Sequence, residues 1–281
     1  MPNLCCLSLT NSLMNDDLIR VFINELKAKE TDEDSCSIRD TLVELNLSYN
    51  KLTTEGFRLV LLYFFDGDNR HAVNDYHSSN DHDQDQDHER TSASILSTLK
   101  VAGNKIRAEG ARTLGRILKY NTSLENLDLR MNLLNDEGGK LVMNGLHQNQ
   151  TLKRLNLSCN SLSSMTSDSL CAIFETSNCR PNGIASLSCS DPPQGNVLEH
   201  IDISSNDFKS SDIINLAHAV EQTYTLLSLD LRENRADTET SKTSIVHKVT
   251  KTEALESIHD KLKSNASRSA GPQSVPQSEM Q

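Results

Sequence analysis

Aliphatic residues return along the chain in one pattern, Leu-x-x-Leu-x-Leu-x-x-Asn-x-Leu. Copies of the pattern begin at Leu42, Leu96, Leu124, Leu152, Leu198 and Leu226. Three of the steps between successive copies are 28 residues long. A weaker copy begins at Leu4, with Ser12 and Met14 where asparagine and leucine are expected. The alternation of leucines predicts a short strand with one buried face in every copy.

The second half of each unit has the spacing of a helix. Gly110, Leu114 and Leu118 are four residues apart, which gives one buried helical stripe. Other units carry the same spacing at Gly138, Val142, Leu146, Asp212, Leu216, Val220, Phe22 and Leu26. A unit of strand, turn and helix with a period near 28 residues predicts leucine-rich repeats of the long, ribonuclease-inhibitor-like class. We therefore expect an α/β, right-handed horseshoe solenoid, with parallel strands on the concave face and helices on the convex face.

An asparagine follows each predicted strand, where the chain leaves the sheet. Its amide can both donate and accept, so it can bond backbone groups of its own coil and of the next. The stacked repeats are therefore expected to hold a structural ladder of buried asparagines at Asn50, Asn104, Asn132, Asn160, Asn206 and Asn234.

The repeats predict one leucine-rich-repeat domain of about seven units over residues 1–235. Longer steps place insertions near residues 28–40, 66–94 and 178–196, which we expect to form loops at one edge of the stack. Beyond the last repeat, apolar residues predict a C-terminal capping helix within 236–263, and the polar segment 264–281 is expected to be disordered.

Composition favours a cytosolic protein. No apolar run approaches the roughly 18 residues needed to cross a membrane, and no leader-like segment opens the chain. The seven cysteines are odd in number and irregularly spaced, which favours reduced thiols over a disulfide framework. Five Asn-x-Ser/Thr triplets, among them those at Asn121, Asn149 and Asn265, are then interpreted as accidental.

The insertion at 66–94 is rich in aspartate and histidine. His71, His77, His82 and His88 are suitable metal ligands in type, but an EF-hand loop counted from Asp81 lacks the required glycine and glutamate. We interpret the segment as a solvated, self-repelling loop and expect no metal site. It accounts for −6 of the net charge of −11, so the rest of the chain is only mildly acidic and implies no nucleic-acid partner.

No catalytic or cofactor-binding constellation is evident. The chain has no glycine-rich phosphate loop, no HExxH and no GxSxG motif, so we expect no enzyme, no cofactor and no small-molecule substrate. The candidate functional surface is instead the concave wall, where mixed charges suit protein recognition. The predicted protein-binding residues are Lys100, Asp128, Arg130, Arg154, His200, Asp202, Asp230 and Arg232. The positions one pleat beyond the strands, including Ser48, Ala102 and Ser158, are also expected to be exposed.

Two stretches carry a family resemblance. The sequence from Leu124 to Asn160, with LDLRMN, DEGG and LNLSCN, and the later SLDLRENR resemble the repeats of the dynein regulatory complex subunit 5 family, also called T-complex-associated testis-expressed protein 1. The resemblance covers most of the chain from Leu96 to Arg235. It implies a non-enzymatic component of the axonemal nexin–dynein regulatory complex in motile cilia and flagella, with other subunits of that complex as partners. This chain departs from the family in lacking a long region ahead of its repeats and in carrying the 66–94 and 178–196 insertions.

The sequence therefore predicts a cytoplasmic, cytoskeletal interaction scaffold of the cilium or flagellum, with no membrane contact. Two alternatives remain on the same fold. One is a regulator of a small GTPase, resembling the activating protein of Ran, and the other is an inhibitor that occludes an enzyme.

Overall fold

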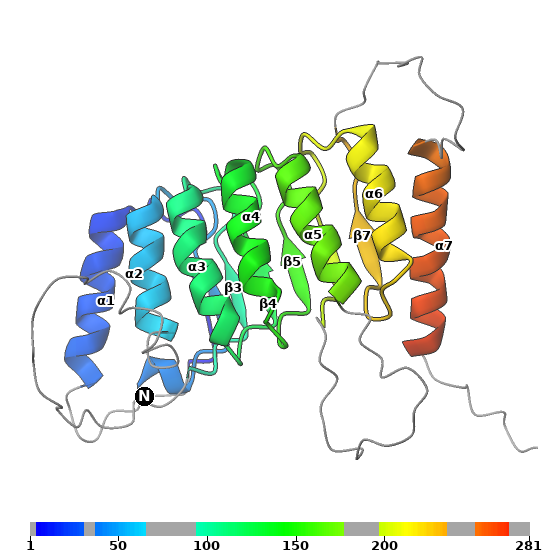
Figure 1. Ribbon diagram of the computed structural model, residues 1–281. Helices are drawn as coiled ribbons and strands as arrows, with labels where there is room; N and C mark the ends of the chain where they lie inside the picture. Colours follow the sequence, from blue (N-terminus) through cyan, green and yellow to red (C-terminus); the bar gives the residue numbers. More distant parts are fainter. Residues whose placement is uncertain (1–3, 31–36, 66–93, 177–196, 235–250, 270–281) are drawn as a thin grey trace, which may run out of the picture.

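The computed structural model describes residues 4–30, 37–65, 94–176, 197–234 and 251–269. Within these ranges, strands and helices alternate along the chain and stack side by side (Figure 1). The strands are β1 (Cys6–Ser8), β2 (Glu44–Asn46), β3 (Thr98–Lys100), β4 (Asn126–Asp128), β5 (Arg154–Asn156), β6 (His200–Asp202) and β7 (Ser228–Asp230). The helices are α1 (Asp16–Glu30), α2 (Thr54–Phe65), α3 (Ala108–Tyr120), α4 (Asn135–Leu146), α5 (Ser164–Thr176), α6 (Ser210–Val220) and α7 (Lys251–Ser269), and a short 3-10 helix, η1, spans Ile38–Asp40.

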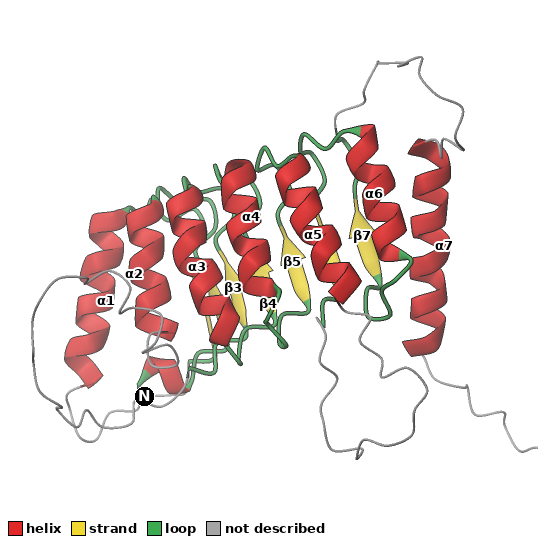
Figure 2. Ribbon diagram, viewed as in Figure 1, coloured by secondary structure: helices red, strands yellow, loops and turns green. Residues whose placement is uncertain are grey.

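The strands form one parallel sheet in chain order, β1 to β7. The central residue of each strand pairs with the central residue of the next, as Leu99 does with Leu127 and Leu127 with Leu155. The helices form a second layer on one side of this sheet (Figure 2). The prediction of a parallel-strand solenoid is therefore confirmed.

The leucines of the repeat make up the core between the two layers. Leu99, Leu127 and Leu129 are at most 2% exposed, and so are their equivalents in the neighbouring coils. The core is weaker in the first unit, where Ile19 and Ile23 are buried but Phe22 and Leu26 are only partly covered. This difference follows from position, because α1 has a helical neighbour on one side only among the described residues.

The repeat asparagines close the turns with a recurring set of hydrogen bonds, except that Asn160 Oδ1 has no hydrogen-bond partner in the described residues. In Asn132, Nδ2 donates to the carbonyls of Leu129 (2.9 Å) in its own coil and Val101 (3.1 Å) in the preceding coil. Its Oδ1 accepts the N–H of Ile106, also in the preceding coil, at 3.1 Å. The six asparagines are at most 9% exposed. Their bonds reach back to the preceding coil, whereas the sequence interpretation had them reaching to the next.

A second asparagine ladder lies at the opposite edge of the stack. Asn149 Oδ1 accepts the N–H groups of Thr151 and Leu152, and its Nδ2 donates to the carbonyls of Leu118 and Asn121 in the preceding unit. Asn121 Oδ1 bonds its own turn in the same way, accepting the N–H of Leu124 at 2.8 Å. These Asn-x-Ser/Thr triplets therefore have a structural origin, since the asparagine fixes the turn that leads into the next strand.

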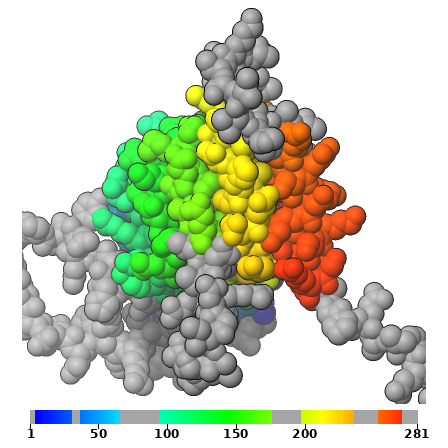
Figure 3. All heavy atoms as spheres, turned by 45° about the vertical axis from the view of Figure 1, so that its right-hand side comes forward, coloured from blue at the N-terminus to red at the C-terminus, as the bar shows by residue number. Residues whose placement is uncertain are grey.

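The last helix, α7, overlaps the predicted capping helix and packs against α6, but its bounds differ from those predicted. Asn265 in α7 donates to the carbonyls of Thr223 and Leu226, which lie between α6 and β7. Asn149 likewise donates to two carbonyls of the preceding unit, those of Leu118 and Asn121. Thus α7 is the regular helix of the seventh unit, beside α6 (Figure 3). It ends at Ser269, six residues beyond the predicted boundary at 263, and Asn265 is the buried residue of this added stretch, so the expected disorder is wrong for residues 264–269.

Much of the predicted loop structure lies outside the described residues. This applies to the insertions 66–94 and 178–196 apart from Ser94, to residues 236–250, and to the tail after Ser269. None of the helices in the described ranges has the length and apolarity needed to span a bilayer.

Glycines let α3 and α4 approach each other unusually closely. A Cβ at Gly145 would lie 2.7 Å from Gly115 Cα, and a Cβ at Gly115 would collide with the carbonyl of Leu141. No real Cβ tolerates such contacts with backbone, so both helices require glycine at these positions.

Gly145→Ala is therefore expected to lower the free energy of unfolding by about 1–3 kcal/mol. Alanine gains about 1 kcal/mol of helix propensity, but overpacking a rigid contact typically costs more. Chemical denaturation should show this loss, with the exposed neighbour Asn144→Ala as a control that stays near wild type. A Gly145→Ala protein as stable as wild type would show that the two helices are farther apart than described.

Candidate protein-binding face

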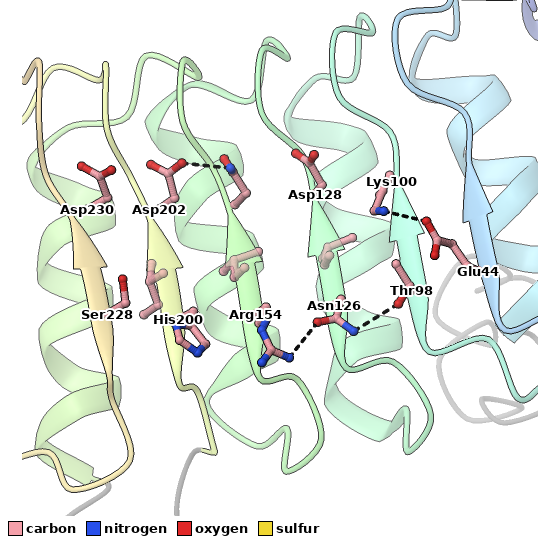
Figure 4. Close-up of a pocket in the computed structure, with 14 residues that line it drawn as sticks. Glu44, Thr98, Lys100, Asn126, Asp128, Arg154, His200, Asp202, Ser228 and Asp230 are labelled. Atoms are coloured by element: carbon pink, nitrogen blue, oxygen red, sulfur yellow. Dashed lines mark hydrogen bonds and ion pairs between the residues drawn. The ribbon is translucent and has the colours of Figure 1, made fainter. Parts of the chain in front are cut away.

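The concave face is built from the outward residues of the three-residue strands. The middle residue of each strand points into the core, so the first and third residues face the groove. From β2 to β7, the first residues form the leading row, which runs Glu44, Thr98, Asn126, Arg154, His200 and Ser228. The third residues form the trailing row, which runs Asn46, Lys100, Asp128, Asn156, Asp202 and Asp230. All of these except Asn46 line a groove of about 530 Å³ that extends from β2 to β7 (Figure 4).

The side chains of the trailing row also hold the turn that follows each strand, a role that the sequence analysis did not predict. Asp128, Asp202 and Asp230 each accept, through Oδ1, the backbone N–H two residues later, at 3.0–3.1 Å. Asn46 and Asn156 do the same in their units. The recurring Asp or Asn is thus explained by the turn that ends each strand. Its signal in the sequence was the repeated Asx-Leu-Ser or Asx-Leu-Arg triplet.

Three ion pairs within the chain lie on or beside the concave face. Lys100 Nζ lies 2.6 Å from Glu44 Oε1, and Arg232 lies 2.6 Å from Asp230 Oδ2. Arg130 Nε lies 3.3 Å from Asp128 Oδ2, close enough for an ion pair but not aligned for a hydrogen bond. Such partly exposed pairs contribute at most about 1 kcal/mol each, so their main effect is to reduce the charge offered to a partner.

The centre of the groove keeps its charges uncompensated. Among the described residues, neither Arg154 nor Asp202 has an opposite charge within ion-pair distance. In the described residues, the Arg154 guanidinium donates to Asn126 Oδ1 at 3.3 Å, while Asp202 accepts from Asn156 Nδ2 at 2.9 Å and from Ser204. His200 lies next to both: it is the β6 residue directly opposite Arg154 of β5, and it is two residues before Asp202 on the same strand (Figure 4).

Two aspartates of the trailing row differ in acidity. Burial raises the pKa of Asp128 above its ordinary value, and nearby Asp202 adds to this against the opposing effects of Arg130 and Lys100. The hydrogen bond from the Arg232 side chain holds the pKa of Asp230 below its ordinary value, although burial opposes the shift. Both carboxylates have an ion pair within their own chain, which Asp202 lacks among the described residues.

The structure separates the predicted binding residues into two groups. Lys100, Asp128, Arg154, His200, Asp202 and Asp230 line the groove. Arg130 and Arg232 do not, because they follow the ends of β4 and β7 and fold onto their aspartates. The prediction that residues one pleat beyond the strands are exposed is wrong for Ser48, Ala102 and Ser158. They are at most 7% exposed, because the turns cover them.

Metal chemistry finds no support in the part of the chain that the structure describes. There, no three residues among histidine, cysteine, aspartate and glutamate are grouped closely enough to hold an ion. The histidines of the 66–94 insertion lie outside the described residues.

Comparison with known proteins agrees with the repeat architecture. Residues 41–58, 120–143 and 148–164 match the Leucine Rich repeat family. A stretch of 73 residues is 41% identical to leucine-rich repeat-containing protein 45 of Gallus gallus, which covers 25% of this chain and 11% of that protein. The chain therefore carries leucine-rich repeats and matches only a small part of this relative's length.

Solved structures similar to this one include three of low sequence identity. The tropomodulin C-terminal domain of Caenorhabditis elegans is 13% identical with a TM-score of 0.43, covering 90% of this chain and 95% of that one. Leiomodin-1 Actin-Binding Site 2 is 13% identical with a TM-score of 0.39, covering 88% and 89%. An internalin of Listeria monocytogenes is 13% identical with a TM-score of 0.35, covering 76% and 49%.

Proposed function

We propose that this protein is a non-enzymatic scaffold that binds a protein partner in its concave groove. The observation that carries the proposal is the central trio of Arg154, His200 and Asp202, which faces the groove without an ion pair in the described residues. Solenoids of stacked repeats commonly use their concave face for binding, since curvature gives an extended surface.

The chemistry of the trio defines the partner. Arg154 is exposed and offers a guanidinium for a carboxylate, while Asp202, one row away on the next strand, offers an acceptor for a cation. The partner surface should therefore carry both signs of charge in the matching order, which favours one docking register over others.

The finer proposal is that the partner belongs to the nexin–dynein regulatory complex of motile cilia and flagella. It is supported by the resemblance of residues 124–160 and 228–235 to the dynein regulatory complex subunit 5 family. The protein would then be cytoskeletal and axonemal. Co-sedimentation with salt-extracted axonemes tests this location. Recovery of the protein only in the soluble fraction would reject the axonemal role. This assay does not depend on the concave groove, so the binding face is tested separately.

Reversing the central charge should weaken partner binding while preserving the fold. Arg154→Glu is expected to reduce affinity at least about tenfold, which corresponds to 1.4 kcal/mol. Because Arg154 is exposed, the thermal midpoint should stay close to that of wild type. The measurement is isothermal titration against a partner first recovered by pull-down from ciliated-cell extract.

Lys140→Glu provides the matched control. Lys140 is exposed on α4, in the helical layer and away from the groove. Its replacement by glutamate changes the net charge by the same amount as Arg154→Glu. Equal weakening by both variants would indicate a nonspecific charge effect and reject the groove as the binding surface.

The alternative of a small-GTPase regulator has its own test. If the pull-down recovers a GTPase, and this protein increases the rate at which that GTPase hydrolyses GTP, the alternative would be supported instead.

A further inference from the structure

From β4 to β7 the two rows of the groove differ in charge. The leading row contains no carboxylate in this stretch, which runs Asn126, Arg154, His200 and Ser228. The trailing row contains no basic residue there and runs Asp128, Asn156, Asp202 and Asp230. Figure 4 shows the three aspartates along one side of the groove and Arg154 and His200 along the other. A segment bound in this stretch therefore meets a guanidinium and an imidazole on one flank and carboxylates on the other.

The first part of the groove does not share this arrangement. There Glu44 lies in the leading row and Lys100 in the trailing row, and the two side chains form an ion pair at 2.6 Å. Their charges offset each other, so a partner meets the charge of the groove over β4 to β7. Asp202 is the main acidic anchor of this stretch. Among the described residues it has no ion pair, whereas Asp128 and Asp230 each have an arginine of their own chain.

The spacing of the strands favours one conformation of the bound segment. Neighbouring strands are about 4.8 Å apart, so β4 to β7 span about 14 Å along the groove. One turn of a helix advances about 5.4 Å, which is close to one strand spacing. Side chains on one face of an extended chain are about 6.8 Å apart and fall out of step with the strands. A helix of nearly three turns therefore keeps its side chains level with the four strands, and an extended chain lying along the groove does not.

The space between the two rows also suits a helix. The first and third residues of one strand lie about 7 Å apart, and the middle residues between them point into the core. These middle residues are at most 2% exposed in Leu127, Leu155 and Ile201. No middle side chain of these three strands therefore rises between the rows. A helix with small residues along its line of contact can lie there, with charged side chains on both of its flanks.

We propose that the partner lays an α-helix along the groove over β4 to β7, with basic side chains towards the trailing row and an acidic side chain towards Arg154. This inference rests on the proposed function and names the kind of segment that the groove binds. Basic residues at i, i+7 and i+11 share one flank of a helix and lie about 10.5 and 16.5 Å beyond the first. Measured from Asp128, the strands of Asp202 and Asp230 lie about 10 and 14 Å along the groove.

The acidic position of the partner helix follows from its handedness. Residue i+4 lies about 40° round the helix from residue i and about 6 Å along its axis. When the helix runs from β4 towards β7, this rotation turns residue i+4 towards the leading row. It then comes level with Arg154, one strand spacing from Asp128. The bound segment should therefore carry an acidic residue at i+4 beside its basic residues.

A designed helix tests the proposal on the full chain. The probe is an alanine-rich peptide of about four turns, with lysines at i, i+7 and i+11, glutamate at i+4 and a hydrocarbon staple on its outer face. Fluorescence anisotropy at low salt should give a dissociation constant of about 50 µM. An isomer in which the glutamate and the last lysine exchange places should bind at least about fivefold more weakly. An unstapled peptide with the same charges and a central proline should bind at least about tenfold more weakly, because it cannot hold the helix.

Asp202→Asn gives a matched change in the protein. Asparagine removes the charge but keeps the bond to the turn, as Asn46 and Asn156 do at the same row position. The thermal midpoint should therefore stay near that of wild type, while binding of the stapled probe weakens about fivefold. Asp207→Asn is the control, because Asp207 is exposed in the turn after β6 and outside the groove, and this variant should bind the probe as wild type does.

Two results would overturn the helical partner. One is a stapled probe that binds no better than its isomer or the proline peptide, and the other is equal binding of the probe by wild type and Asp202→Asn. The recovered partner separates this outcome from failure of the proposed function. If Arg154→Glu weakens binding of that partner while the stapled probe fails, the groove is the binding surface and the inference of a helix alone is wrong. If Arg154→Glu leaves binding of the partner unchanged, both proposals are rejected.

Discussion

Leu129→Ala should lower the free energy of unfolding by about 2–5 kcal/mol, the largest effect expected of a single change in the repeat. Leu129 is fully buried in the fourth coil and packs among the leucines of neighbouring coils. Truncation removes its apolar contacts and leaves a cavity that two flanking, interlocked coils cannot close. Urea unfolding followed by circular dichroism measures the loss.

Leu133→Ala is the matched control for this change. Leu133 lies four residues later in the same coil but is 46% exposed, so its truncation should cost little. Equal stability losses for the two variants would show that the assignment of buried and exposed leucines in this coil is wrong.

Asn132→Ala should cost about 1–3 kcal/mol or more, although it removes only a few atoms. The N–H of Ile106 loses its acceptor, and the carbonyls of Val101 and Leu129 each lose one of two amide donors, because Asn104 and Asn160 still donate to them. They lie in two adjacent coils, so the loss weakens the contact between repeats as well as one turn. In a solenoid the contact between neighbours supports the whole stack.

Hydrogen exchange gives this prediction a local readout. The N–H of Ile106 should exchange faster in Asn132→Ala, because its acceptor is the side chain that has been removed. Asn144→Ala, at an exposed position of α4, should change neither stability nor that exchange rate. Unchanged protection of Ile106 in Asn132→Ala would contradict the ladder.

The periodic features of the fold were predictable because each residue type has a single physical role at its place in the repeat. Leu99, Leu127 and Leu155 alternate with polar residues, which is typical of a strand with one buried face, and Asn132 and Asn160 recur where a turn needs both a donor and an acceptor. The last helix was placed less well. In other units, the small helix residue that faces the preceding unit comes eleven residues after the central strand residue, as Gly138 does after Leu127. In the last unit the corresponding distance, from Leu229 to Ala254, is 25 residues, so the period of the repeat did not indicate where α7 lies.

The candidate face was predicted in outline but not in detail. Alternation correctly places Arg154, His200 and Asp202 on the outward side of their strands. It cannot show that turns cover Ser48 and Ala102, because that depends on where the chain bends after the strand. Nor does it show that Arg130 folds back onto Asp128. The three-dimensional arrangement places six of the eight predicted residues in the groove, and whether they bind a partner stays a prediction.

The sixth unit offers the most direct test of concave binding. It carries two histidines on opposite faces, His200 in the groove and His218 exposed on α6. A photoreactive residue is placed at either position and illuminated with the partner present, and cross-linked products are identified by mass spectrometry. We expect the protein labelled at His200 to capture the partner and the protein labelled at His218 to capture none. Capture from His218, with none from His200, would contradict a binding site in the concave groove.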